Sequence, residues 1–550
     1  MGRRDKHGRL RQGKVGARAR LALSVVLTML AVAPLGLAQD RLDPTPRAAS
    51  GGVYRRPLGS DPATLDPGRI NDLYGRSVAH QIFDGLVQFD QTLTISPALA
   101  RHWRGSRDGL TWTFSLRPGV KFHHGREVTS DDVVFTLTRI IDPRTKSEAA
   151  DLFLGIQGAR DFREGRARTV AGLSALDRHT VRVQLQEATV PFVSLLAIGQ
   201  AKIVPRDLVE QQGDAFGTQP VGTGPFRFVR WDRGREIVLS ANLDSFDGVP
   251  RLSRLVYRIF AGELNDLMCQ EFGQGNLEES PVPPSCRNKV TDPRYLYVRR
   301  PTFNVRFYGL NARVRPLNDV RVRQAIVHAI DRDTIVQEIF LGRHATARGI
   351  LPPGMPGYNP QLKPLPHSEA RARELLRAAG YPDGRGLPPI ALWSSVKGER
   401  IERELATVKR QLAQVGIPLE IHYETNWPSF TRLLGEGRLP MFIYAWYADV
   451  PDADNFLYKL FHSRSPRNLT GYANPLVDDL LLQARAERDL PRRIQIYRRV
   501  EQVVVDEAPV VPVWHYAYER LFQSYVKNIE ANGLGDAYLP LRKMWIEPAR

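Results

Sequence analysis

Hydrophobic and polar residues alternate most clearly at residues 111–116, where one Trp, one Phe and one Leu share a face of an extended segment. A Pro-Gly pair ends this strand, and residues 120–122 are expected to form a second short strand. Thr129 then precedes Asp132 by three positions, which is the spacing of a capping box, and apolar residues at helical spacing follow. Residues 101–140 therefore predict a strand, a turn, a second strand and a helix.

Elsewhere in the chain, apolar stripes with helical spacing alternate with short apolar runs typical of strands. Helices are expected at residues 79–87, 191–196, 320–340, 368–380 and 399–415. Strands are expected from residue 53 onward and at residues 181–185, 226–231, 390–393, 419–423, 441–446 and 510–514. The glycine-rich residues 221–226 are interpreted as a turn, because no Gly-Lys-Ser/Thr sequence of a phosphate-binding loop follows them. Helices that alternate with apolar strands predict α/β domains.

The first 38 residues have the three-part layout of a secretory signal peptide. Eight Lys and Arg residues precede an uncharged, mostly apolar run at residues 21–37, and the small residues around Ala38 form a cleavage site. A permanent anchor is the alternative, but 17 apolar residues are at the short end for a spanning helix. No cysteine follows the cleavage site, which argues against a lipid anchor. The mature chain is expected to start near Gln39 and to be soluble and exported.

The charge balance changes this picture little. The full chain carries a formal charge of +18, and loss of the signal peptide leaves 69 cations and 58 acids, or +11. Such basicity can indicate nucleic-acid binding. The cations are scattered, however, and no zinc-finger spacing or aromatic RNA-binding signature accompanies them. We therefore expect a basic protein surface and no nucleic-acid partner.

Two cysteines, Cys269 and Cys286, are the only ones in the chain. In an oxidising compartment an isolated pair most simply forms one disulfide. The residues between them are polar and rich in proline and glycine, so the bond is expected to staple a surface loop.

No known catalytic signature is present, since the chain has no His-Glu-x-x-His, no Gly-x-Ser-x-Gly and no Walker A sequence. His123 and His124 are adjacent in an expected strand, so they would point to opposite faces and could not share a metal ion. Asp131 and Asp132 are interpreted as residues of a helix start. We expect no catalysis, no metal and no cofactor.

A series of short sequence motifs, in a definite order along the chain, says more about the fold and function. Residues 108–125 read DGLTWTFSLRPGVKFHHG, and together with Trp103 they closely resemble family 5 of the bacterial extracellular solute-binding proteins. Further words in the order of that family are TLDP (64–67), IFDGLV (82–87), VGTGPF (221–226), RVRQAIVHAIDRDTI (321–335), ILPPGMPGY (350–358), WYADVPDADNFL (446–457) and EAPVVPVW (507–514). The resemblance covers nearly the whole mature chain. The one departure noted is FHHG where the family usually has FHDG.

This resemblance implies a two-lobe α/β clamshell of the periplasmic-binding-protein type, type II-like, with an additional inserted domain. Lobe one would comprise residues 39–80, 218–301 and 515–550, the additional domain residues 81–217, and lobe two residues 302–514. It also implies a monomeric receptor that captures peptides and delivers them to the membrane permease of an ABC importer. Alternatives are another solute, such as an opine, haem, a metal chelate or an oligosaccharide, or, from a different class, a secreted hydrolase.

Asp449 is the first candidate for ligand recognition. It lies just past the expected strand 441–446, at the strand end where ligand crevices form in α/β sheets. Aromatic neighbours, Tyr444, Trp446 and Tyr447, would exclude water and strengthen an ion pair with a cation. In the resembling family, the aspartate of the W-x-x-D word binds the ammonium group of peptides, and Asp449 is the matching residue.

An arginine on the helix at residues 399–415 is the corresponding candidate for the ligand carboxylate, because the dipeptide receptors of the family take one from this helix. Arg403 is preferred by its offset from the helix end, and Arg400 is the other candidate. Trp427 and Trp393 are expected either to line the cleft or to lie in the core.

Overall fold

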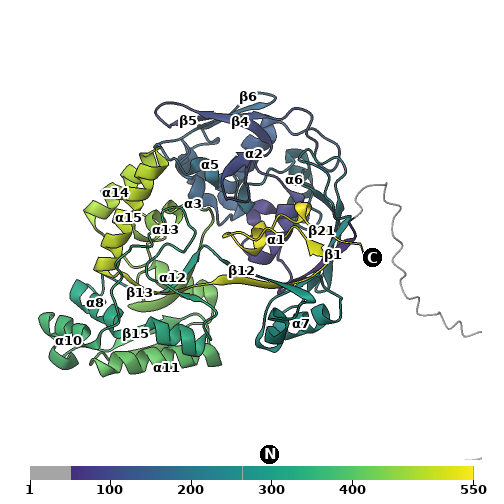
Figure 1. The fold of residues 1–550 in the computed structure, drawn as a ribbon. Helices are drawn as coiled ribbons and strands as arrows, with labels where there is room; N and C mark the ends of the chain where they lie inside the picture. The colour runs from purple at the N-terminus through teal and green to yellow at the C-terminus, as the bar shows by residue number, and fades with distance from the viewer. Residues whose placement is uncertain (1–50, 263, 549–550) are drawn as a thin grey trace, which may run out of the picture. The chain divides into compact units, whose positions relative to one another are not determined.

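The computed structural model describes residues 51–262 and 264–548 (Figure 1). The predicted signal peptide lies outside the described residues and stays a prediction. Within the described part of the chain, no helix is both long and apolar enough to span a bilayer.

The segments predicted to form lobe one supply a four-stranded sheet. In spatial order its strands are β1 (Val53–Leu58), β10 (Arg254–Ile259), β9 (Glu236–Ala241) and β8 (Phe226–Asp232). β1 pairs with β10 in parallel, and the other pairs are antiparallel. α1 (Leu73–Ile82) packs with this sheet in one hydrophobic core that also includes C-terminal residues such as Leu541 and Met544.

A second four-stranded sheet comes from the chain segment predicted to form the additional domain. Its order is β4 (Ala100–Gly105), β5 (Thr111–Leu116), β7 (Thr180–Gln184) and β6 (Leu173–Asp177). The predicted alternation is confirmed, because Phe114 and Leu116 are buried in the core on the face that α2 (Ser130–Ile141) covers. The shorter helices of this segment are α3 (Ala150–Phe153), α4 (Ala159–Arg163), α5 (Phe192–Leu195) and α6 (Arg206–Gln212).

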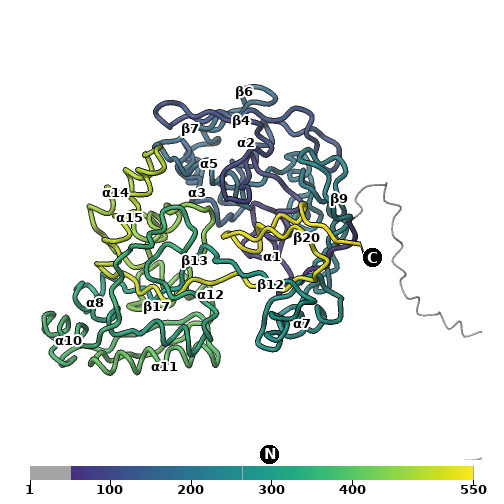
Figure 2. Tube along the Cα trace, viewed as in Figure 1, coloured from purple at the N-terminus to yellow at the C-terminus, as the bar shows by residue number. Residues whose placement is uncertain are grey.

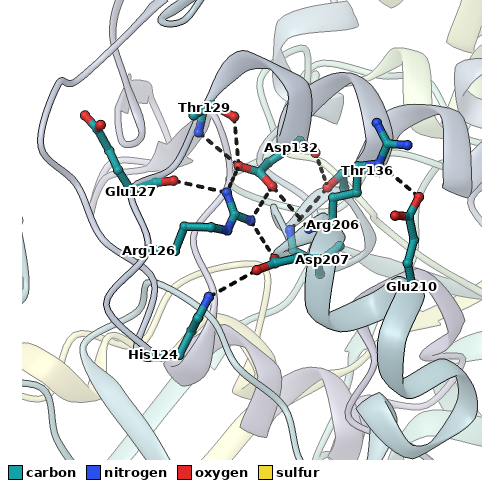
Figure 3. Close-up of polar contacts among 10 residues, drawn as sticks. His124, Arg126, Glu127, Thr129, Asp132, Thr136, Arg206, Asp207 and Glu210 are labelled. Atoms are coloured by element: carbon teal, nitrogen blue, oxygen red, sulfur yellow. Dashed lines mark hydrogen bonds and ion pairs between the residues drawn. The ribbon is translucent and has the colours of Figure 1, made fainter.

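Asp132 lies in the first turn of α2 and is the centre of the polar network in Figure 3. Its carboxylate accepts a hydrogen bond from the Thr129 backbone N–H at 2.9 Å, as the predicted capping box requires. Arg126 donates to both carboxylate oxygens, at 2.7 and 3.0 Å, and the Arg206 backbone N–H donates at 3.1 Å. Arg126 also contacts Asp207 of α6, so this network connects the start of α2 with α6.

A six-stranded mixed sheet forms the segment predicted as lobe two. Its order is β14 (Ala345–Thr346), β18 (Val510–His515), β13 (Asn304–Leu310), β17 (Met441–Tyr447), β15 (Ile390–Ser394) and β16 (Leu419–Tyr423). One face packs on α8 (Val320–Ala329), α10 (Glu369–Ala378) and α11 (Glu399–Gln414). The other face packs on α12 (Trp427–Gly435), α13 (Asp454–Phe461), α14 (Pro475–Ala486) and α15 (Leu490–Glu507). Neighbouring residues of β13 point to opposite faces of the sheet, as the two-residue period of a strand requires. Tyr308 packs in the core with α8, α10 and α11, and Phe307 packs in the core with α12 to α15.

Three expected elements were wrong in extent. The helix expected at residues 79–87 is α1, which begins after Asp72 and ends before Phe83, where the backbone becomes extended. Residues 320–340 do not form one helix, because Ile330 is extended and Asp331 caps a new turn. Residues 120–122 make only a single bridge, between Lys121 and Glu127, instead of a strand.

Two adjacent chain segments connect the six-stranded sheet with the rest of the fold (Figure 2). β12 (Tyr295–Pro301) leads directly into β13, and β18 leads directly into β19 (Ala517–Gln523). β12 and β19 pair antiparallel along seven positions, and β11 (Glu279–Ser280) extends this small sheet. These two crossing segments, one through β12 and one through β19, are therefore joined to each other by backbone hydrogen bonds.

The predicted pairing of Cys269 with Cys286 is present, and it joins α7 (Asn265–Gly273) to the turn at residues 284–290. The bond does more than staple a surface loop. Both cysteines are buried in a small core with Phe272 and Leu521, so the disulfide and the apolar cluster hold this lobe-one segment together.

Candidate functional site

A cavity of about 990 Å³ lies where residues of both predicted lobes meet. Predicted lobe one contributes Leu73, Arg76 and residues 264–267, 281–284, 516–520 and 533–538 to its lining. Predicted lobe two contributes Thr302, Phe303, Arg343, His344, Arg400, Tyr447 and Ala448. The crossing strands β12 and β19 thus bring distant parts of the sequence to one cavity.

A second cavity of about 260 Å³ shares Arg76 and Tyr447 with the first, so the two adjoin. The additional-domain segment contributes Glu148, Ala149, Asp151, Leu152 and Gln200 to its lining. Predicted lobe two contributes residues 444–447 at the end of β17, with Asp449, Lys459 and Arg467.

Asp449 lies in the smaller cavity, two residues after β17 ends. Asn455 holds it in place, because its side-chain oxygen accepts from the Asp449 backbone N–H at 3.0 Å and its amide donates to the carboxylate at 3.3 Å. The Tyr538 hydroxyl donates to the Asp449 carbonyl at 3.4 Å. Among the described residues, no Lys, Arg or His nitrogen lies within 4.0 Å of this half-buried carboxylate. The carboxylate belongs to a residue that lines the cavity, so a ligand there can reach it.

The three aromatic residues predicted beside Asp449 line the same cavity as Asp449. Tyr444, Trp446 and Tyr447 all line the smaller cavity, and the Tyr447 ring stacks on Tyr516 with centroids 5.8 Å apart. The Trp446 indole N–H is buried and has no acceptor in the described part of the chain. A polar ligand atom at this position would supply the missing acceptor.

The two other tryptophans named from the sequence do not line either cavity. Trp427 is 52% exposed and stacks on Tyr444 with centroids 6.3 Å apart. Trp393 stacks on His422 at 4.8 Å and packs against the lobe-two core.

The two candidate arginines of α11 differ in position. Arg403 is exposed, pairs with Glu399 at 3.8 Å, and is absent from both cavity walls. Arg400 lines the large cavity, and it has no ion pair with any described residue. Of the other arginines that line this cavity, Arg343 pairs with Glu519 at 3.1 Å and Arg520 with Asp536 at 3.3 Å, whereas Arg76 has no ion pair with a described residue.

Several charged residues of the smaller cavity were not identified from the sequence: Arg76, Glu148, Asp151, Lys459 and Arg467. They come from separate segments that no local pattern connects. Lys459 gives the strongest local signal, as a lone cation in the apolar α13. Burial lowers the pKa of its ammonium group, and the Asp449 carboxylate acts against that shift.

The adjacent histidines lie in a turn, not in a strand, and still diverge. His123 is turned toward the backbone of the 221–226 turn, with its Nε2 3.0 Å from the Gly224 carbonyl oxygen. His124 Nε2 lies 3.6 Å from an Asp207 oxygen (Figure 3). No cluster of three or more His, Cys, Asp or Glu side chains suited to a metal ion occurs within the described ranges.

Comparison with known proteins gives consistent matches. The family model described as bacterial extracellular solute-binding proteins, family 5 middle, matches residues 94–468. The glutathione-binding protein GsiB of Shigella flexneri is 28% identical over 482 residues, which cover 86% of this chain and 90% of the relative. The unliganded open form of the periplasmic murein tripeptide binding protein MppA is 25% identical, with a TM-score of 0.76 and coverage of 90% and 98%. The periplasmic binding protein DppA from Helicobacter pylori, in complex with the peptide STSA, is 27% identical, with a TM-score of 0.75 and coverage of 90% and 99%.

Proposed function

Because this chain belongs to family 5 of the bacterial extracellular solute-binding proteins, we propose that it is a periplasmic receptor that captures short peptides for an ABC importer. GsiB is named for glutathione and the structure of DppA is a complex with STSA, and both ligands are short peptides. The cavities lie among segments of all three predicted domains, which suits a ligand that must contact more than one of them.

The unpaired Asp449 carboxylate is the observation that carries this proposal. A half-buried carboxylate with no Lys, Arg or His nitrogen within 4.0 Å among the described residues has room for a ligand ammonium group, which would form a charge-assisted hydrogen bond with it. The rings of Tyr444, Trp446 and Tyr447 lower the local dielectric and so strengthen such a pair.

Arg400 is the residue that would bind the carboxylate at the other end of the peptide. It lines the large cavity without an ion pair, whereas Arg403 faces solvent and contacts Glu399. A planar guanidinium at this position suits a peptide carboxylate, which it can bind with two hydrogen bonds. We therefore assign the carboxylate contact to Arg400 in preference to Arg403.

The receptor works by capture without chemical conversion. A ligand that contacts both lobes binds the closed arrangement better than the open one, so it shifts the equilibrium toward the form that docks on a permease. The crossing pair β12 and β19 is the connection about which such a change would occur. The protein acts as a monomer in this scheme.

Calorimetry with di-, tri- and tetrapeptides of alanine and with glutathione tests the proposal. Asp449→Asn should weaken binding by about 2–4 kcal/mol, the scale for loss of one partner of a desolvated charge pair, or roughly 30- to 1,000-fold. N-acetylation of the peptide should weaken binding by a similar factor, and the two losses should not add. Asp479→Asn, an exposed aspartate outside both cavities, is the control.

The arginines form a second matched pair. Arg400→Gln should weaken binding at least tenfold, and Arg403→Gln should change it less than about twofold, because Arg403 touches neither cavity. Unchanged affinity in Asp449→Asn would contradict the ammonium contact and favour an uncharged ligand such as an oligosaccharide.

A further inference from the structure

Six charged side chains line the smaller cavity. They are three cations and three carboxylates: Arg76, Lys459, Arg467, Glu148, Asp151 and Asp449. None of the six has an oppositely charged group within 4.0 Å anywhere in the described part of the chain. Elsewhere in this arginine-rich protein close ion pairs are common, for example Arg493 with Asp452 at 2.6 Å. The cavity therefore holds charges that can still pair after a change of conformation.

The charges are divided between parts of the chain. The additional-domain segment contributes only carboxylates, Glu148 just before α3 and Asp151 in its first turn. Lys459 of α13 and Arg467 come from predicted lobe two, and α3 lies next to α13 in Figure 1. Arg76, from predicted lobe one, also lines the large cavity. A closer approach of the additional-domain segment to lobe two would thus bring opposite charges together.

These two segments already touch next to the cavity. The Val190 backbone N–H donates to the Arg485 carbonyl oxygen at 2.9 Å, which joins the additional-domain segment to the end of α14. Val450, the residue after Asp449, is buried in the core of the additional-domain segment. Because the backbones are in contact, rotation of long flexible side chains can form ion pairs with little further movement.

Lys459 is the cation whose surroundings a ligand would change most. Burial lowers the pKa of its ammonium group, and of the carboxylates that act against this shift Asp449 is the strongest, followed by Asp454 and Asp151. Asp454 already has a cation, since Arg485 Nε lies 3.4 Å from one of its oxygens. Lys459 therefore has two carboxylates to choose between, Asp449 of its own lobe and Asp151 of the additional-domain segment.

A ligand ammonium group at Asp449 would alter this choice. It would neutralise the carboxylate that acts most strongly on Lys459 and would place a like charge near the lysine. We propose that this releases Lys459 to pair with Asp151, so that the additional-domain segment and lobe two close over the bound ligand. Arg467 and Glu148 form a second pair in the same step. These four side chains are an electrostatic gate, and the inference rests on the proposed function because the ligand ammonium group at Asp449 opens the sequence of events.

Calorimetry with trialanine and N-acetyl-trialanine tests the gate. Asp151→Asn should weaken the binding of trialanine about fivefold, and less than twofold when Lys459→Gln is also present, since the pair is then already lost. N-acetyl-trialanine has no ammonium group to release Lys459, so Asp151→Asn should change its Kd less than twofold. Glu164→Gln, an exposed glutamate of the additional-domain segment outside both cavities, is the control and should change neither Kd.

The outcomes separate the gate from the proposed function. An equal loss of affinity for both peptides in Asp151→Asn, or no loss for either, overturns the gate, and peptide capture stands if Asp449→Asn still weakens the binding of trialanine. If neither trialanine nor glutathione binds the unmodified protein, the proposed function itself is wrong. Glu148 is exposed, so Glu148→Gln with and without Arg467→Gln provides the same comparison if Asp151→Asn does not fold.

Discussion

Replacing Glu404 by glutamine tests how much a buried ion pair stabilises lobe two. The Glu404 side chain, on α11, is fully buried. Its carboxylate lies 3.1 Å from Arg306 Nη2 and accepts a hydrogen bond from the Tyr308 hydroxyl at 2.6 Å. Burial by itself would lower the pKa of Arg306, but the Glu404 carboxylate outweighs this and raises it, so the guanidinium stays charged.

Removing one partner of a buried pair costs about 3–5 kcal/mol, because the other charge remains without compensation. Glutamine can still accept from Tyr308, and Arg306 keeps its place over the Trp514 ring, 4.7 Å from the centroid. The expected loss in Glu404→Gln is therefore about 3 kcal/mol, near the lower limit. Urea unfolding followed by tryptophan fluorescence and circular dichroism measures it as a lower midpoint at unchanged slope.

Glu399→Gln is the matched control, because this glutamate lies on the same helix but its side chain is 87% exposed. Its pair with Arg403 should contribute less than about 0.5 kcal/mol. The double replacement of Glu404 by Leu and Arg306 by Met should cost less than the sum of the single replacements, because it leaves no buried charge. The reasoning is refuted if Glu404→Gln lies within 0.5 kcal/mol of the unmodified protein.

Two further predictions concern single carboxylates. Asp132→Asn should destabilise the fold by about 2–4 kcal/mol, because the Asp132 carboxylate accepts hydrogen bonds from the Thr129 backbone N–H at the start of α2 and from Arg126. Asp131 is exposed, so Asp131→Asn should have little effect, and urea unfolding of both variants measures the difference. Burial raises the pKa of Glu501 to about 7, above its value in the unfolded chain, so its stabilising contribution is complete below about pH 4.3 and is lost as the pH rises through 7. Glu501→Gln should flatten the pH dependence of the unfolding free energy by up to about 3 kcal/mol between pH 4 and 8, and an equally steep profile in the variant would contradict this.

Local elements of the fold, and one position of the candidate site, could be placed from the sequence alone. The alternation at β5, the capping box at Asp132 and the strand that ends before Asp449 are local features, and the structure has each of them. Strand and helix periods depend on the residue's own neighbours, so they can be recognised without knowledge of the fold.

The tertiary structure decided which charges meet. Arg400 and Arg403 are three positions apart on one helix, and only the fold brings Arg400 to the cavity that residues 517–520 and 533–538 also line. Glu404 is a charged residue within the apolar stripe of α11. Its partners, Arg306 and Tyr308, lie about 100 positions earlier in the chain, so only the tertiary structure explains why a carboxylate is buried there.

The smaller cavity shows the same difference between local sequence features and contacts of distant segments. Asp449 was identified from its place after a strand, but Arg76, Glu148 and Lys459 reach the cavity from three separate segments. Hydrophobic burial is non-directional and sets the elements and their inward faces, whereas a charge interacts with whatever the folded chain brings within a few ångströms. The sequence by itself therefore determined the elements and the position of Asp449, and the packing of distant segments determined the set of charges around it.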